Sequence, residues 1–309
     1  MEATVRRSRM HRASTGRRIE LSPRDIAIFC VLAQYRYLPS TYIHAFVGGA
    51  STTRFKERLG DLFHEGYLDR PEQQWTLANC RYVPVTYELG NGAKRALADH
   101  GTSSNDARTW LTNEAHRQFA HSLLVCELVA SFELGTLHAS DLRFIPWAEI
   151  LAKAPEATRR SAVPFRIPVP GPSAGLVPDA IFGLEYRAGG KRTYRFVALE
   201  ADRGTMPVVR SNPAQSSYGK KIAAYQETLT RGAHRSHLGL PNLLVLTVTT
   251  NEPHLRQIIK YVEQSACSDA AFLFGALAAP AEAVRRPLTD LLTMPWRRVG
   301  WPPLRLDQG

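Results

Sequence analysis

The first regular hydrophobic pattern in the chain begins at Ser22, after a polar stretch in which apolar side chains are scarce. Ser22, Pro23 and Asp25 are typical of a helix start, because serine caps free amide groups, proline fits the first turn and an acid favours the positive end of the helix dipole. Apolar residues then recur three and four positions apart, as expected for helices with one buried face. The pattern predicts three successive helices, over residues 22–35, 39–47 and 51–65.

Shorter apolar stretches after the third helix have the character of β-strands. The segments 67–70 and 82–89 flank a polar turn, and residues 90–99 return to helical spacing. Three helices followed by a strand, a turn and a strand are typical of a winged helix-turn-helix, which is a DNA-binding architecture. Winged helices also serve as protein-interaction modules. We predict a winged helix-turn-helix domain over residues 21–100.

The third predicted helix is the one expected to enter the major groove of DNA. Its polar positions include Thr53, Arg54, Lys56 and Arg58, which can donate hydrogen bonds to phosphates and base edges. These four residues are the predicted DNA contacts of this domain. The segment 51–70 contains four basic and four acidic residues, so its own electrostatic attraction to DNA is weak.

Residues 1–20 contain six arginines and two acids, with few apolar residues to pack. Such a segment is expected to be a disordered basic arm. Its arginines, Arg17 and Arg18 among them, are placed to lie along DNA phosphates. A tail that only increases solubility is the alternative, since a run of positive charge does not by itself identify a partner.

The second half of the chain has the pattern of a layered domain. Residues 101–113 are polar and rich in turn-forming residues, so we interpret them as a linker. The helix predicted over 114–134 is apolar on most sides and should be buried, so its acid Glu127 needs a partner. The remaining elements are strands over 142–146, 177–186, 193–199 and 242–249, with helices over 217–229 and 252–263. The order helix, strand, strand, strand, helix, strand predicts an α/β domain over 114–280.

The C-terminal segment 281–309 interleaves aromatic and basic residues, among them Trp296 and Trp301. Stacking on nucleic-acid bases is one interpretation of such a tail. Docking of the tryptophans on their own domain is the favoured one, because a tryptophan buries a large apolar area.

Three carboxylates lie at the ends of two neighbouring predicted strands. Asp179 is near the start of one strand, and Glu200 and Asp202 end the next. Side chains on a strand alternate between its faces, so Glu200 and Asp202 point to the same side. If the two strands pair, Asp179 joins them, and ionised carboxylates at close range repel one another. The spacing favours a site for Mg²⁺ or Mn²⁺, with ordinary strand-end acids as the alternative.

Composition indicates a partner and excludes several classes of protein. The net charge of +11 and the pI near 9.7 favour a polyanionic partner, nucleic acid first and an anionic membrane surface second. We expect no membrane-spanning run and reduced, scattered cysteines, and therefore a cytoplasmic protein. The sequence contains no glycine-rich phosphate loop and no Gly-x-Ser-x-Gly motif.

An ordered set of short motifs resembles the replication-relaxation family of plasmids and other mobile elements. The matching segments are 21–38, 58–70, 87–89, Gly92, His121, 177–180, 199–205 and 221–225. The resemblance implies a two-domain α+β or α/β protein. Its N-terminal winged helix-turn-helix would be followed by an αβββαβ domain similar to PD-(D/E)XK nucleases.

In that nuclease-like fold, Asp179 and Glu200 match the metal-binding acids, and Glu127 or Glu133 matches an acid that some members supply from the first helix. Asp202 stands where the pattern has a lysine, so a lysine of the following helix is the candidate replacement. The catalytic residues implied by the resemblance are Asp179, Glu200, Asp202, Lys221 and Lys220. The implied metal ligands are Asp179, Glu200, Asp202 and Glu127.

The function expected from these features is DNA binding during replication or transfer of a plasmid or mobile element. The expected partners are duplex DNA, replication or transfer proteins and a second copy of the chain. A metal-dependent DNA endonuclease targeted by the winged helix is the first alternative. A transcription regulator whose second domain senses a ligand is the other.

Overall fold

The computed structural model describes residues 7–16, 19–76, 80–101, 119–170, 175–204, 206–211, 217–265, 270–277 and 285–309. The chain divides into two compact units. Unit 1 comprises Met1–Arg108, Asn113–Ala130 and Pro280–Pro287, and unit 2 comprises Thr109–Thr112, Ser131–Ala279 and Leu288–Gly309. The division falls inside helix α5 (Phe119–Thr136). It was expected in the linker 101–113, and all but the first residue of that linker lies outside the described residues.

The first turns of α5 belong to unit 1 because they pack on its core. The ring of Phe119 meets Tyr37 edge-on at 5.3 Å between centroids. Two turns later the buried Cys126 Sγ donates a hydrogen bond of 2.8 Å to the carbonyl oxygen of Tyr35. The boundary predicted from composition therefore differs from the observed one, since apolar contacts rather than chain polarity decide it.

Three helices form the core of unit 1, close to the predicted ranges. They are α1 (Pro23–Tyr35), α2 (Ser40–Val47) and α3 (Thr52–His64). At the start of α1, Ser22 accepts a hydrogen bond from the Asp25 amide, and Asp25 accepts one from the Ser22 amide at 2.8 Å. This capping box satisfies amide groups that have no partner within the helix. The predicted cap is therefore confirmed.

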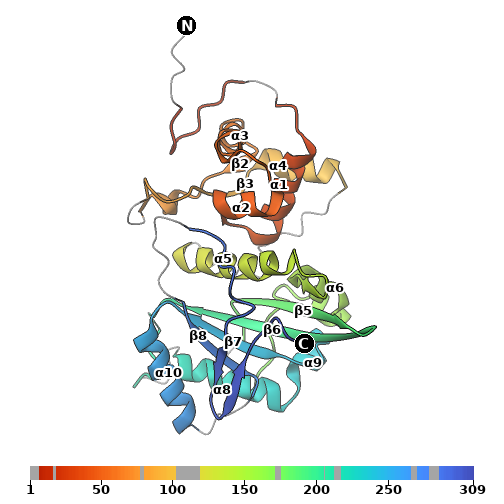
Figure 1. Ribbon diagram of the computed structural model, residues 1–309, viewed down its shortest axis with the longest axis vertical. Coiled ribbons are helices and arrows are strands. Elements are labelled where there is room, and N and C mark those ends of the chain that lie inside the picture. The colour runs from red at the N-terminus through yellow and green to blue at the C-terminus, as the bar shows by residue number, and fades with distance from the viewer. Residues whose placement is uncertain are drawn as a thin grey trace. The chain divides into compact units, whose positions relative to one another are not determined.

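A small antiparallel sheet in the order β1-β3-β2 completes unit 1, with α4 (Asn91–Asp99) after it (Figure 1). Its strands are β1 (Leu38–Pro39), β2 (Leu68–Asp69) and β3 (Thr86–Leu89). Both predicted strands are shorter than expected, and part of the predicted turn is a 3₁₀ helix, η1 (Glu72–Thr76). The β2–β3 pair and its connection follow directly on α3.

The N-terminal arm differs from the disordered segment that its composition predicted. Arg12 donates hydrogen bonds to the carbonyl oxygens of Phe63 and Leu68, at 2.9 and 3.1 Å. The Thr15 amide donates one of 2.9 Å to Glu65. Hydrogen bonds from the Thr15 amide and from the hydroxyl groups of Ser14 and Thr15 lower the pKa of Glu65 to about 2. Residues 7–16 therefore run along the end of α3, whereas Arg17 and Arg18 lie outside the described residues.

Unit 2 is built on a seven-stranded sheet in the order β10-β9-β8-β7-β6-β5-β4. The strands are β4 (Leu142–Ile145), β5 (Ala180–Ala188), β6 (Lys191–Asp202), β7 (Leu244–Thr249), β8 (Phe272–Ala276), β9 (Trp296–Arg298) and β10 (Trp301–Leu304). β6, β7 and β8 are parallel, and the other neighbours are antiparallel. The described chain is therefore a mixed α/β protein with two sheets.

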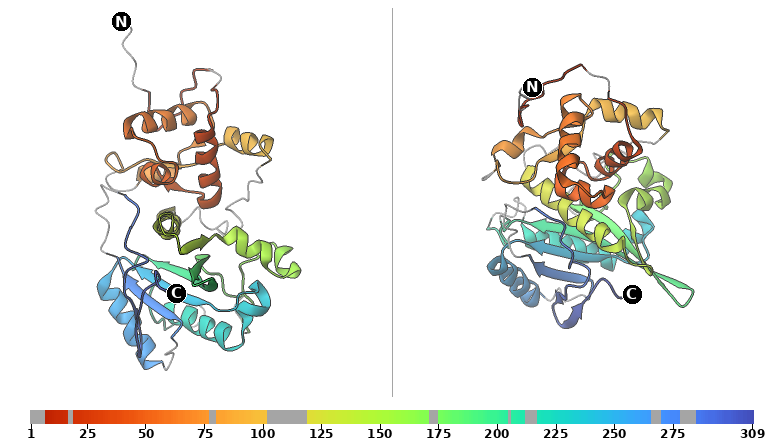
Figure 2. Two further views of the ribbon diagram at one scale, coloured as in Figure 1. Left: turned by 45° about the vertical axis from the view of Figure 1, so that its right-hand side comes forward. Right: turned by 45° about the horizontal axis from the view of Figure 1, so that its top comes forward.

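Helices α8 (Tyr218–Thr230) and α10 (Glu252–Gln264) lie on the same face of this sheet (Figures 1 and 2). Phe132 of α5 packs against Phe182 of β5 at 4.9 Å between centroids. The further helices of unit 2 are α6 (Trp147–Lys153), α7 (Glu156–Arg159) and α9 (Ala233–Leu238). The predicted order of helix, three strands, helix and strand is present as α5, β4, β5, β6, α8 and β7, with the short helices inserted.

The C-terminal segment is part of the sheet rather than a separate tail. Trp296 of β9 is completely buried, and its indole N–H donates a hydrogen bond of 3.0 Å to the carbonyl oxygen of Leu291. Gly275 of β8 makes room for this ring, since a Cβ there would lie 2.4 Å from the indole. Trp301 is half exposed. Docking of Trp296 on its own unit, the favoured interpretation, is confirmed.

Helix α5 is long and apolar enough to cross a membrane by length and composition alone, whereas the sequence predicted no membrane-spanning run. However, 67% of the helix is buried in the structure. An apolar helix that is mostly buried is typical of the core of a globular protein.

Candidate functional site

A strip of buried polar side chains crosses the centre of the unit 2 sheet. Glu200 and Asp202 of β6 pair in register with Thr247 and Thr249 of β7. All four are at most 8% exposed. Because strand residues two apart share a face, both acids lie on the same side, as the sequence predicted. This side is the one covered by α8 and α10, from which further polar groups approach.

Lys221 of α8 lies between two of the predicted acids. Its Nζ donates a hydrogen bond to Glu200 Oε2 and is 3.7 Å from Asp179 Oδ1. The Tyr225 hydroxyl, one helical turn further along, donates a bond of 2.5 Å to Glu200 Oε1. Asp179 Oδ2 accepts a bond of 2.9 Å from the Ala201 amide. We call Asp179, Glu200, Lys221 and Tyr225 the acid–lysine cluster.

The electrostatics of the acid–lysine cluster are unusual for an ion pair. Burial raises the pKa of Glu200 to about 7, and the charge of Asp179 adds to the rise, against the opposing effects of Lys221 and Tyr225. Burial acts to lower the pKa of Lys221, but Asp179 and Glu200 outweigh it and raise that pKa. The pKa of Tyr225 is also raised, by burial and by Glu200. Lys221 therefore stays charged near neutral pH, while Glu200 can exchange a proton there.

Asp202 has a different partner from the other two acids. Its Oδ2 lies 2.7 Å from Nε2 of His254, in the first turn of α10, and its Oδ1 accepts a bond of 3.0 Å from the Gly204 amide. Both the Oδ2 and the Nε2 are buried, and neither has a well-directed hydrogen bond. Asp202 therefore lies beside His254, whereas Lys221 lies beside Asp179 and Glu200.

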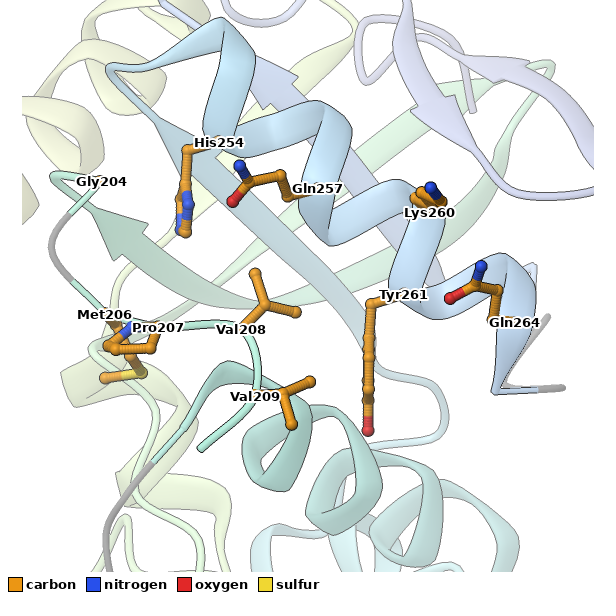
Figure 3. Close-up of a pocket in the computed structure, with 10 residues that line it drawn as sticks. All are labelled: Gly204, Met206, Pro207, Val208, Val209, His254, Gln257, Lys260, Tyr261 and Gln264. Carbon is orange, nitrogen blue, oxygen red and sulfur yellow. The ribbon is translucent and has the colours of Figure 1, made fainter. Parts of the chain in front are cut away.

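His254 also lines a pocket of about 540 Å³ beyond the end of β6 (Figure 3). One wall is the apolar segment Met206–Val209, and the other is the face of α10 that carries Gln257, Lys260, Tyr261 and Gln264. Open α/β sheets often bind ligands beyond the carboxyl ends of parallel strands, which is where this pocket lies.

The structure does not unite all of the predicted metal ligands. Glu127 belongs to unit 1, where Arg285 binds its carboxylate at 2.8 Å. Among the described residues, no three His, Cys, Asp or Glu side chains are arranged to hold a metal ion. Lys220, the other candidate lysine, is exposed on α8. Of the predicted catalytic set, Asp179, Glu200 and Lys221 come together.

The predicted DNA contacts of α3 fall into two groups. Thr53, Arg54 and Lys56 are exposed on the first half of the helix. Arg58 instead binds the buried Asp25, with Nη2 at 2.6 Å from Oδ2 and Nε at 3.0 Å from Oδ1. This bidentate pair fastens α3 to the start of α1, so Arg58 has a structural partner in place of a phosphate.

Sequence reasoning missed the role of His254 and did not assign one to Tyr225. Tyr225 had a usable signal, because it lies four positions after Lys221 and therefore on the same helix face. His254 had none, since its contact with Asp202 depends on where α10 crosses the end of β6.

Comparison with known proteins gives one match. The sequence model of the replication-relaxation family matches residues 29–244, which is more than half of the chain. No curated protein and no solved structure matches it. The matched segment includes α3 of unit 1 and the whole acid–lysine cluster of unit 2. The chain therefore belongs to the replication-relaxation family, which suggests a role in the replication or relaxation of a plasmid or other mobile element.

Proposed function

We propose that this protein binds duplex DNA through a winged helix-turn-helix in unit 1 as part of that role. The observation that carries the proposal is the exposed half of α3, with Thr53, Arg54 and Lys56 directed away from the core. The succession of three helices and the β2–β3 hairpin supports it, because a winged helix has these elements in this order. The net charge of +11 supports a polyanionic partner.

A double substitution, Arg54→Ala with Lys56→Ala, tests this proposal in the full chain. Each side chain that leaves a phosphate or base edge costs about 1–3 kcal/mol of binding, so duplex affinity should fall at least tenfold. Fluorescence anisotropy with a labelled duplex measures it. The matched control is Lys94→Ala with Arg95→Ala on α4 of the same unit, which removes the same charge. Equal losses in both double variants, or a parent that binds no duplex, would count against recognition by α3.

Metal-dependent cleavage of DNA by a PD-(D/E)XK-like unit 2 is the second candidate function. The observation that favours it is the ammonium group of Lys221 beside Asp179 and Glu200. In this proposal Lys221 supplies from α8 the charge that position 202 lacks. It would offset the negative charge that develops on the phosphate, while Tyr225 holds the carboxylate of Glu200 in place.

The number of carboxylates in the acid–lysine cluster suits Mg²⁺ or Mn²⁺. Mg²⁺ commonly takes one or two protein carboxylates and completes its shell with water and phosphate oxygens. Asp179 and Glu200 would be those two carboxylates, and Asp202, held at His254, would not be a third. A bound ion would activate water and stabilise the leaving oxygen.

Cleavage of supercoiled plasmid DNA with and without Mg²⁺ or Mn²⁺ tests this second function. The parent should nick or linearise DNA only with the ion, and Asp179→Ala and Lys221→Met should each lose that activity by about a hundredfold or more. Lys220→Met should retain most of it, which distinguishes the buried lysine from its exposed neighbour. Identical activity in the parent and in Asp179→Ala would show that this cluster does not cut DNA.

A further inference from the structure

The hairpin between β5 and β6 extends well beyond the sheet from which it arises. β5 and β6 pair as far as Ala188 and Lys191, but β4 pairs with β5 only up to Tyr186, and β7 pairs with β6 only from Val197. The end of the hairpin is therefore a two-stranded ribbon, and no strand among the described residues pairs with it on either side (Figure 2). We call residues 187–194, all of them exposed, the basic ribbon.

The basic ribbon carries positive charge without compensating acids. Arg187, Lys191 and Arg192 lie within it, and it contains no aspartate or glutamate. Arg187 is paired at 2.7 Å with Glu185, at the base of the ribbon. Among the described residues, neither Lys191 nor Arg192 has an acidic partner. Two uncompensated cations, Lys191 and Arg192, at the end of a projecting element attract a polyanion.

The register places two of these cations opposite one another. Arg187 pairs with Arg192 across the strands. Like charges directly opposite destabilise a β-ribbon, so an isolated hairpin gains nothing from this arrangement. Tyr194, 36% exposed, lies on the same face, because it is two positions from Arg192. Two guanidinium groups and a phenol on one face are groups that donate hydrogen bonds to phosphates.

The turn of the ribbon is narrow. Gly189 and Gly190 have φ values of 55° and 77°, the left-handed conformations that a two-residue hairpin turn requires. A Cβ at either position would meet no atom within 4 Å, so a side chain there would have open space around it. A two-stranded β-ribbon is one of the elements that the major groove of DNA admits.

We propose that the basic ribbon is a second contact surface for duplex DNA, formed by unit 2 independently of α3. Arg192 contacts phosphates together with Tyr194 on the same face, and Lys191 contacts phosphates from the opposite face of the ribbon. The inference rests on the proposed DNA binding and adds a new surface to it. An anionic lipid surface would satisfy the same charges, but it offers no groove to a slim ribbon, so duplex DNA is the favoured partner.

The test is the salt dependence of duplex binding by the full chain with Lys191→Ala and Arg192→Ala combined. Removal of one phosphate contact reduces the slope of log K against log salt by about 0.9, so the double variant should have a slope lower by about 2. Its affinity at low salt should fall about tenfold or more. Both residues are exposed, and far-UV circular dichroism with a thermal melt verifies that the fold is retained.

The matched control is Lys153→Ala with Arg160→Ala in the same unit. These side chains are 73% and 79% exposed, and their removal changes the net charge equally. They should leave the slope unchanged. An unchanged slope in the Lys191→Ala, Arg192→Ala variant, with a parent that binds duplex, overturns the ribbon but not the role of α3.

If the parent protein binds no duplex at all, the proposed DNA-binding function itself is contradicted. In that case vesicles containing phosphatidylserine provide the remaining arm of the test. Vesicle binding that depends on Lys191 and Arg192 would overturn the proposal in favour of a lipid surface.

Discussion

Unit 1 and unit 2 each contain a carboxylate that is almost completely buried beside a basic side chain. In unit 1, Asp25 accepts two hydrogen bonds from Arg58 and two from Ser22. Burial acts to raise its pKa, but these bonds outweigh burial and lower it. In unit 2, burial prevails, and the pKa of Glu200 rises to about 7 beside Lys221.

The difference lies in how many donors each carboxylate has and in its neighbours. Asp25 accepts four hydrogen bonds, whereas Glu200 accepts bonds from Lys221 and Tyr225 and has the charge of Asp179 nearby. A carboxylate with a lowered pKa stabilises the fold at neutral pH, and one with a raised pKa is held there at a cost. Groups retained at such a cost are typical of functional sites, so the contrast favours the proposed role of Glu200 and a structural role for Asp25.

The largest effect is expected for Asp25→Ala. The substitution removes the reciprocal half of the capping box of α1 and leaves the guanidinium of Arg58 without its acidic partner, so the free energy of unfolding should fall by about 3 kcal/mol. Because the Arg58 side chain is 35% exposed, the loss of stability should lie at the lower end of the range for broken buried ion pairs. Hydrogen exchange of the α1 and α3 amides in native buffer measures the loss within unit 1.

Asp61→Ala is the matched control for that change. Asp61 lies on α3 and pairs with Arg7, but both side chains are more than one-third exposed. Exposed pairs contribute little, so this variant should lose less than about 0.5 kcal/mol. Equal losses in the two variants would remove the distinction between Asp25 and an ordinary surface acid.

The contrast between these two pairs shows what sequence patterns can predict. The capping box at Ser22 and Asp25 is local, and hydrophobic spacing placed α1, α3, α8 and α10 within a few residues. Arg58 was predicted as a DNA contact from its polar position on the third helix. Its partner Asp25 is 33 positions away, so no local pattern indicates their contact. Short elements also escaped prediction. Helix α9 has only six residues, which is too few for apolar residues to repeat at helical spacing.

The candidate site was also predictable only where it depends on local sequence patterns. The alternation of strand residues was enough to place Glu200 and Asp202 on one face, and the absence of a lysine at 202 made Lys220 or Lys221 the candidate replacement. The separation of Asp202 from the other acids was not predictable, because it follows from the crossing of α10 over the end of β6. The ammonium group of Lys221 lies beside Asp179 and Glu200, two of the acids whose spacing favoured a metal.

The second-largest effect concerns pH. The unfolded-state pKa of a glutamate is about 4.3, and that of Glu200 in the folded protein is about 7, so the folded state binds the proton more tightly. Its contribution to stability is complete below pH 4 and is lost as the pH rises through 7. Compared with Glu200→Gln, the parent should lose roughly 2.5 kcal/mol between pH 5 and pH 8. Urea unfolding of both proteins across this range measures the difference, and parallel curves would show that Glu200 does not titrate there.

Replacement of the basic partner should destabilise the two units unequally. The losses in free energy of unfolding should differ by roughly 1–2 kcal/mol at pH 6. In Lys221→Met, Glu200 can take up a proton. A neutral buried carboxyl group costs less free energy than a buried charge, so the loss of stability is limited. Arg58→Met leaves Asp25 with its Ser22 bonds but without its main counter-charge, at a pH where an aspartate resists protonation. We expect Arg58→Met to be the more destabilising in hydrogen exchange of its own unit. The opposite order would indicate that Glu200 is held as an anion by more than Lys221.

The smallest effect is expected for Tyr225→Phe, which removes one hydroxyl and leaves the ring in place. The hydroxyl donates to Glu200 Oε1 at 2.5 Å and favours the charged form of the carboxylate. Without it the pKa of Glu200 should rise further, and stability should fall by about 1 kcal/mol at pH 8. At pH 5 the neutral acid depends less on this donor, so the loss should shrink. Urea unfolding at both pH values measures it, with Tyr261→Phe on α10 as a control that retains a similar ring. A loss of the same size at both pH values would mean that Tyr225 acts through packing alone, and that Lys221 is the main group stabilising the charge of Glu200.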